Sequence, residues 1–390
     1  MLQRSIVGEA ELRPEPLGPT VRHLLAGARA LPRRLSPDDR AALGMWAAAH
    51  LALFVLAWAA AWVYRSTPGH APLAGVFEHW DAGLLRRIAQ YGYFSPRSAA
   101  NDTAFFPGYP ATLAAVHLIL RNWVLCELVI SGVAGCFVVV SLSRLAGGRR
   151  AVLYLLTAPS AVFLMVGYAE CLFLALAIPA WHAATRGRWW RAALLAGLSG
   201  LVRPGAVFLI PALAVMALTG PAGSRLVSVA KSCCGLAGPA AYEIYLTMRT
   251  GAWEAWANAK QAGWDLHQVT PIQALKTTWW AAFRHPYSAA FAFGSQLELA
   301  AMAAMLLATL AFLWWCRWPE AVYCGLAVIV LGTQTWYQSC PRTLLVLFPV
   351  WIALARLEAR QPWVRYIYFG VSAPLAALVG LLFLTYQWTG

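Results

Sequence analysis

Carboxylates, a histidine and aromatic residues gather in one polar stretch of an otherwise apolar chain. The stretch begins at Glu78-His79-Trp80-Asp81 and continues to Asp102, directly before the run Phe105-Phe106-Pro107-Gly108-Tyr109-Pro110. Polar groups at the edge of hydrocarbon are costly, and they persist where they have a function. A carboxylate at this place can act as a general base that takes the proton from an acceptor hydroxyl. We assign that role to Asp81.

A structural role for Asp81 is the alternative. Apolar residues recur at helical spacing from Trp80 to Tyr91 and predict a short amphipathic helix on the membrane surface. Asp81 would then cap the helix, and Gly92 would end it. The two roles are compatible, because a cap residue lies at the start of a helix and points outward.

Other residues of the stretch are candidates for contact with substrate, namely Glu78, His79, Trp80 and Asp102. Solvated loops also contain such residues. Glu78 and Asp81 are three positions apart and would lie close on a turn, where they could bind sugar hydroxyls or a cation. A lone histidine with scattered carboxylates is a weak metal signal, so we predict no metal cofactor and leave a divalent cation open.

Charged side chains also interrupt later apolar segments. Glu170 follows Tyr168 at a bend, and we expect both to bind substrate, because intramembrane carboxylates usually have a function. Pairing of Glu170 with Arg203 or with backbone is the alternative. Arg203 precedes the helix-breaking Pro204, and with Arg342 it would suit a lipid phosphate. Snorkelling of the two arginines toward headgroups accounts for them equally well.

A second long polar segment, residues 249–290, is rich in tryptophan. We expect Lys260 and Trp264 to contact substrate, since aromatic rings can stack on sugar faces. Gln338 would contribute from a later bend. Tryptophan also concentrates at membrane interfaces whatever the function, so an interfacial belt is the alternative.

These residues must be positioned inside a membrane. The 390 residues are 60% hydrophobic and 12% charged, whereas a soluble domain carries about 25% charged residues. Apolar runs between short arginine-bearing loops predict an all-α polytopic membrane protein with about 10 to 12 membrane segments. The formal net charge of +14 is explained by basic residues in cytoplasmic loops that contact anionic membrane lipids. It therefore indicates membrane lipids as partners, not nucleic acid. The eight cysteines include no CxxC pair and predict neither a disulfide nor a zinc framework.

The N-terminal residues 1–42 are polar and basic without an apolar core, which predicts a cytoplasmic tail and not a signal peptide. Residues 43–390 would form the transmembrane domain. After a first span, residues 65–105 become the first external loop and 249–290 the second long one.

The topology can be tested by charge. If 106–121 dips in without crossing, and 192–202 and 206–218 form a short pair, about two thirds of the lysines and arginines lie on the side of the tail. The polar features named above then collect on the external face.

For a sugar transferase, this sidedness decides the class of donor. The chain has no GxGxxG, Walker or HExxH pattern, and no cytoplasmic acidic motif that would hold a nucleotide sugar with a metal. A sugar transferase with external polar residues needs a lipid-linked donor, because nucleotide sugars are not available on that face. A lipid-linked-sugar flippase or transporter is the alternative, as is a non-catalytic partner of another transferase. No inverted repeat typical of many transporters is visible.

Several short motifs follow one another in a characteristic order and spacing from about residue 44 onward. They are His79-Trp80-Asp81, Ile88-Ala89-Gln90-Tyr91-Gly92-Tyr93, Ala104-Phe105-Phe106-Pro107-Gly108-Tyr109-Pro110, Ala158-Pro159-Ser160-Ala161-Val162-Phe163, Tyr168-Ala169-Glu170-Cys171-Leu172-Phe173, Leu201-Val202-Arg203-Pro204-Gly205, Ser339-Cys340-Pro341-Arg342 and Leu347-Phe348-Pro349. In this order the chain resembles the PIG-V mannosyltransferases, which add the second mannose in GPI-anchor synthesis, and especially their bacterial relatives.

The resemblance implies a GT-C type helical bundle with amphipathic surface helices in the first external loop. It implies inverting transfer of mannose from polyprenyl-phosphate-mannose. The family's acceptor does not carry over, and we expect a lipid-linked or cell-envelope acceptor, such as a glycolipid. In that family type an acidic residue of the first external loop is the base, which carries onto Asp81. The expected location is the bacterial plasma (inner) membrane, with the N-terminus cytoplasmic and the site extracytoplasmic. The chain departs from the family at the shortened Arg203-Pro204-Gly205 and at Cys171, where a hydroxyl is usual.

Overall fold

The computed structural model describes residues 35–64, 73–220, 224–284 and 287–387. Across these ranges the chain folds into helices, and the only extended pairing is an isolated bridge between Gln268 and Gln334. This confirms the predicted all-α class. Most of the predicted basic tail, residues 1–42, lies outside the described residues.

Four of the described helices are long and apolar enough to cross a membrane. They are α2 (Pro37–Tyr64), α5 (Trp123–Ala146), α14 (Ala289–Trp314) and α18 (Trp363–Leu384). The number rises to five if α16 (Cys340–Val346) and α17 (Phe348–Arg360), which are bent by 69°, count as one broken span. The protein is therefore an all-α membrane protein by the length and composition of its helices.

Five shorter apolar helices lie among these spans, and they match apolar segments that the sequence predicts. They are α4 (Gly108–Leu120), α7 (Ala169–Thr185), α8 (Trp189–Val202), α9 (Ala206–Thr219) and α15 (Trp318–Gly332). The other helical elements are α3 (Asp81–Tyr91), α6 (Arg150–Leu156), α10 (Arg225–Cys233), α11 (Ala237–Thr250), α12 (Ala255–Trp264), α13 (Pro271–Phe283) and the 3₁₀ turns η2 (Leu73–Phe77), η3 (Asp102–Ala104), η4 (Ala161–Leu164) and η5 (Cys234–Leu236).

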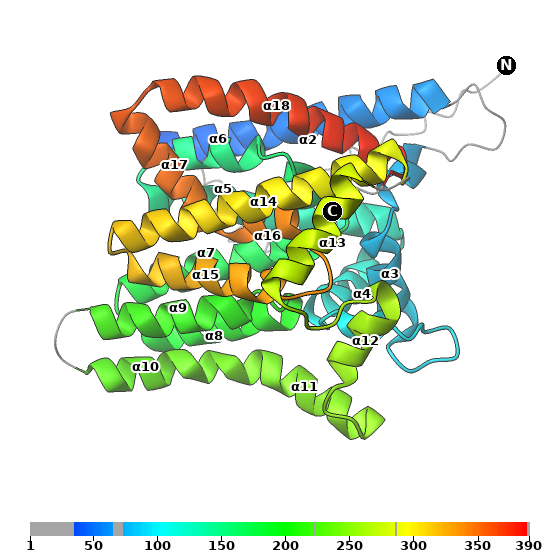
Figure 1. Ribbon diagram of the computed structural model, residues 1–390, viewed down its shortest axis with the longest axis horizontal. Helices are drawn as coiled ribbons and strands as arrows, with labels where there is room; N and C mark the ends of the chain where they lie inside the picture. The colour runs from blue at the N-terminus through cyan, green and yellow to red at the C-terminus, as the bar shows by residue number, and fades with distance from the viewer. Residues whose placement is uncertain (1–34, 65–72, 221–223, 285–286, 388–390) are drawn as a thin grey trace, which may run out of the picture.

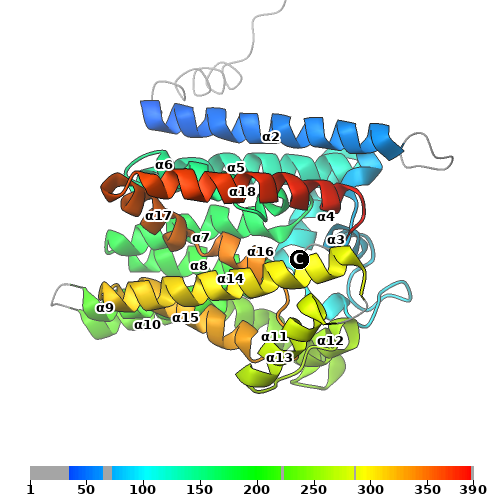
Figure 2. The same ribbon diagram turned by 45° about the horizontal axis from the view of Figure 1, so that its top comes forward.

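The long helices lie side by side, and the short helices α3, α4, α12 and α13 gather at one end of the bundle (Figures 1 and 2). We call this end the site end. The segment 249–290, predicted as a long loop, supplies α12 and α13 there.

An ion pair at the end of the bundle opposite the site end shows how α2 and α5 run relative to each other. Arg144 near the end of α5 binds Asp39 at the start of α2 at 2.9 Å. The two helices therefore run in opposite directions, so the end of α2 and the start of α5 lie at the same end of the bundle, the site end. The dip of 106–121 into the membrane without crossing it stays a prediction.

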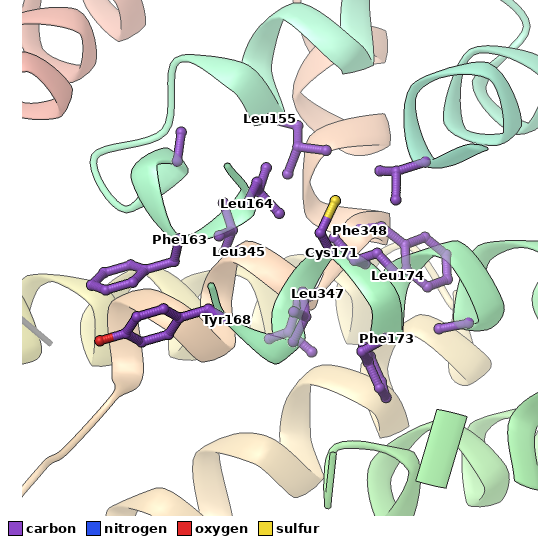
Figure 3. Packing of buried hydrophobic residues seen from close by; sticks show 14 of the residues in the cluster. Leu155, Phe163, Leu164, Tyr168, Cys171, Phe173, Leu174, Leu345, Leu347 and Phe348 are labelled. Carbon is purple, nitrogen blue, oxygen red and sulfur yellow. The ribbon is translucent and has the colours of Figure 1, made fainter. Parts of the chain in front are cut away.

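A dense apolar core supports the site end. Phe163 of η4 and Tyr168, just before α7, lie side by side, with ring centroids 4.9 Å apart, in the same buried cluster as Leu345 and Phe348 (Figure 3). The hydroxyl of Ser160 donates to the carbonyl of Pro341 at 2.8 Å, so the turn before α7 is tied to α16. Close packing of this kind holds polar groups on the adjoining surface in fixed positions.

Candidate functional site

The guanidinium of Arg342 joins two carboxylates that lie far apart in the chain. Arg342 Nη1 donates to Asp81 Oδ2, 261 positions away, at 2.6 Å. Arg342 Nε donates to Glu170 Oε1, 172 positions away, also at 2.6 Å. Its Cζ lies 4.6 Å from the ring centroid of Tyr168, a cation–π distance. The side chain is 10% exposed, so these contacts are charge-assisted bonds in a largely dry place.

Glu170 lies between two arginines. Arg203 Nη1 donates to the same oxygen, Glu170 Oε1, at 2.7 Å. The alternative in which Glu170 pairs with Arg203 is therefore confirmed, with Arg342 as an additional partner. Because Glu170 is fully buried, it would be unstable as an isolated charge, and the two guanidiniums compensate it. Two carboxylates and two guanidiniums leave this cluster formally neutral.

Local backbone features aim these residues at one another. Trp80, before α3, has φ 55°, and Ser339, before α16, has φ 60°, a left-handed conformation that is uncommon for residues other than glycine. Glu298 of α14 accepts the backbone N–H groups of Ser339 at 2.9 Å and Cys340 at 2.7 Å. This carboxylate satisfies donors at the first turn of α16 and fixes its start close to Arg342.

The predicted cap role of Asp81 is wrong. Trp80 occupies the cap position, and its side chain makes no cap hydrogen bond. Asp81 is the first helical residue, and its carboxylate binds Arg342 instead. The end of the helix is confirmed at Gly92, which has φ 73° and donates its N–H to the carbonyl of Ile88.

A cavity of about 210 Å³ opens beside the cluster. Six of the residues predicted from the sequence line it: Asp81, Arg203, Lys260, Trp264, Gln338 and Arg342. Its apolar wall comprises Leu85, Phe105, Phe106, Val202, Phe208, Leu266, Val330, Leu331 and Val346. The site thus combines a few convergent charges with a hydrocarbon-like wall, which suits a polar head attached to an apolar chain.

Lys260 is the cation of the cavity that lacks a carboxylate partner among the described residues. Its Nζ lies 4.8 Å from the ring centroid of Trp256, and burial lowers the pKa of Lys260 to about 8. Arg342, by contrast, already holds two carboxylates. The cations best placed to take an added anion are therefore Arg203 and Lys260, whereas the sequence pointed to Arg203 and Arg342.

Two of the predicted substrate-binding carboxylates brace α3. Glu78 forms an ion pair with Arg86 of α3 and does not line the cavity beside Asp81. Asp102 accepts from Arg87 Nε at 3.1 Å and from the backbone N–H of Ala99 at 2.8 Å. Glu78 and Asp102 therefore hold the helix that presents Asp81, and neither lines the cavity.

His79 and Trp80 pack against the end of the chain. Trp80 stacks on Tyr386 at 4.9 Å between ring centroids, and His79 meets the same ring edge-on at 5.0 Å. Burial lowers the pKa of His79, so its ring is neutral at pH 7. Tyr168 lies beneath Arg342 and is 1% exposed. His79, Trp80 and Tyr168 therefore pack around the Asp81–Arg342–Glu170 cluster and do not line the cavity.

Glu298 is a functional residue that was not predicted from the sequence, although a signal for it is present there. This carboxylate interrupts a long apolar run in α14, and intramembrane carboxylates are functional candidates by default. The structural role of Glu298 depends on the backbone N–H of Ser339, which is 41 positions away in the chain. Within the part of the chain that the structure describes, no group of three or more histidine, cysteine or acidic side chains could hold a metal ion.

Comparison of the chain with protein-family models and with curated proteins gave no match.

Proposed function

We propose that the protein is a membrane glycosyltransferase that moves a sugar, mannose by resemblance, from a polyprenyl-phosphate donor to an acceptor hydroxyl. The observation that supports it best is the composition of the 210 Å³ cavity. One carboxylate, two cations with capacity for an anion and an apolar wall meet there. The protein would have a GT-C type fold with about 10 to 12 membrane segments, in the bacterial inner membrane.

Asp81 is the base of the proposed reaction. Arg342 donates to Oδ2, which leaves Oδ1 for the acceptor hydroxyl. The hydroxyl proton passes to Asp81 as its oxygen forms a bond with the anomeric carbon. The bond between that carbon and the phosphate oxygen breaks, and the electron pair leaves with the polyprenyl phosphate. Attack opposite to the leaving group inverts the configuration.

The leaving phosphate gains negative charge in the transition state. Arg203 and Lys260 line the same cavity, and cations placed where charge develops lower the barrier. Phe105, Phe106 and Phe208 supply apolar surface for the first units of the polyprenyl chain. Trp264 and Gln338 line the cavity near these groups and would orient the sugar.

The site end is extracytoplasmic in this proposal, because a lipid-linked donor is needed only where nucleotide sugars are absent. A cell-envelope glycolipid is the acceptor class. The same cavity would accept another sugar on the same lipid carrier, so the donor must be identified by experiment.

The test is a transfer assay with the purified protein in neutral detergent and a lipid extract of the host membrane. Polyprenyl-phosphate-[³H]mannose, polyprenyl-phosphate-[³H]glucose and GDP-[³H]mannose are supplied in separate reactions, each with wild type and Asp81→Asn. We expect label in a new lipid or protein product only with a lipid-linked donor and wild type. Transfer from GDP-mannose alone, or equal transfer by both proteins, would contradict the proposal. If no product forms, the protein is reconstituted into vesicles, and movement of the donor across their bilayer would favour the flippase.

A further inference from the structure

A second, larger cavity lies at the end of the bundle opposite the site end. Its volume is about 890 Å³. Four helices, α7, α8, α9 and α15, line both cavities with opposite ends. Ala169 of α7 lies at the site and Thr185 at the second cavity; Val330 of α15 lies at the site and Glu320 at the second cavity. The 17 residues of α7 separate the two by about 25 Å, so the second cavity cannot belong to the proposed active site.

Cations form the rim of this cavity. Four arginines line it, Arg186, Arg225, Arg317 and Arg356, together with one carboxylate, Glu320. Arg317 pairs with Glu320. Arg186, Arg225 and Arg356 have no carboxylate partner among the described residues and are exposed. Three cations around one opening attract an anion, and arginine forks match phosphate geometry.

The interior of the cavity is apolar. Trp181 and Phe348, which are 4% and 0% exposed, face it and pack edge to face, with ring centroids 5.5 Å apart. Ala217 and Met216 of α9 complete this floor. Ser224, directly before α10, and Ser228 of α10 line it as well and bring hydroxyl donors. A free phosphate would leave the floor empty, whereas an amphiphile places its head at the rim and its chains against the floor.

We infer that this cavity binds an anionic glycerophospholipid, with the phosphate between Arg225 and Arg356 and acyl carbons on the Trp181–Phe348 floor. The chemistry shared with a soluble ligand is the phosphate; the apolar floor favours the lipid as its source. The inference does not depend on the proposed transferase activity, because its residues lie at the other end of α7, α9 and α15.

Native mass spectrometry of the purified protein in neutral detergent tests the site. The probes are dioleoylphosphatidylglycerol, dioleoylphosphatidylcholine with the same chains and no net charge, and glycerol 3-phosphate with no chains. The variant Arg225→Gln/Arg356→Gln removes two rim charges. Its matched control, Arg149→Gln/Arg360→Gln, removes two exposed arginines that do not line the cavity and have no ion-pair partner among the described residues.

We expect wild type to retain phosphatidylglycerol saturably and in preference to phosphatidylcholine. The rim variant should weaken that retention at least about tenfold, and the control by less than about twofold. Equal loss in both variants would overturn the site in favour of general surface charge. Equal retention of phosphatidylcholine would overturn the role of net anionic charge. Competition by glycerol 3-phosphate as strong as by the lipid would overturn the lipid as the source.

Discussion

Replacing each of the two carboxylates bound to Arg342 by its amide should have different effects on stability and on the transfer rate. Asp81 and Glu170 are both 2.6 Å from that guanidinium, yet only Asp81 lines the cavity. Asp81→Asn replaces an ion pair by a hydrogen bond from the charged guanidinium to a neutral amide oxygen, which lowers the free energy of unfolding by about 1–2 kcal/mol. Glu170→Gln weakens two such bonds, to Arg342 and to Arg203, and should cost about twice as much.

The order of the two variants is reversed for the reaction rate. Asp81→Asn removes the proposed base and should lower the transfer rate by at least about 10²-fold. Glu170→Gln leaves the base in place and should lower the rate by less than about tenfold, through displaced arginines.

The assay pairs thermal unfolding of each detergent-solubilised variant with its initial transfer rate at saturating donor. Asp81→Glu, which keeps the carboxylate, serves as the control for charge. If Glu170→Gln lost as much activity as Asp81→Asn, or if Asp81→Asn turned over near the wild-type rate, the assignment of Asp81 as base would be refuted.

Three further predictions concern a lysine that lines the cavity, the carboxylate at the start of α16 and a close contact between two helices. Lys260 carries its charge below its pKa of about 8, so kcat/KM for the donor should fall as the pH rises through 8; Lys260→Gln should raise KM and abolish this limb, while Lys260→Arg should move it to higher pH, and an unchanged limb in Lys260→Gln would exclude the lysine. Glu298→Gln weakens the two hydrogen bonds to the start of α16 and should lower both the unfolding temperature and the transfer rate; a stable variant with full activity would show that this carboxylate does not position Arg342. Gly238→Ala would bring a Cβ to 2.0 Å from the carbonyl oxygen of Gly197 in the adjacent helix and should destabilise by about 1–3 kcal/mol, whereas Gly370→Ala in α18, with nothing within 4 Å of the added carbon, should leave the unfolding temperature unchanged or raise it slightly.

The contacts of Arg203 and Arg342 differ from what their sequence neighbours indicate. Snorkelling of Arg203 and Arg342 to headgroups was as good an explanation as phosphate binding while only their sequence neighbours were considered. In the structure Arg342 is held between Asp81 and Glu170, and Arg203 reaches the cavity while bound to Glu170. The carboxylates therefore hold both guanidiniums in place and limit how much anion each can take.

The sequence alone determined features that depend on local physics. The apolar runs specify helices long enough for a membrane, the period after Trp80 specifies α3, and Gly92 ends it, because a left-handed residue costs least at glycine. The cost of polar groups in hydrocarbon marked Asp81 and Glu170 as sites of interest. Only the tertiary structure decided which partner each charge has: Glu78 and Asp102 are occupied by arginines of α3, and Lys260 loses basicity through burial. The pairs of Arg342 with Asp81 and Glu170 span 261 and 172 positions, so they depend on how distant helices pack together, and side-chain types and spacing within one segment carry no information about that packing.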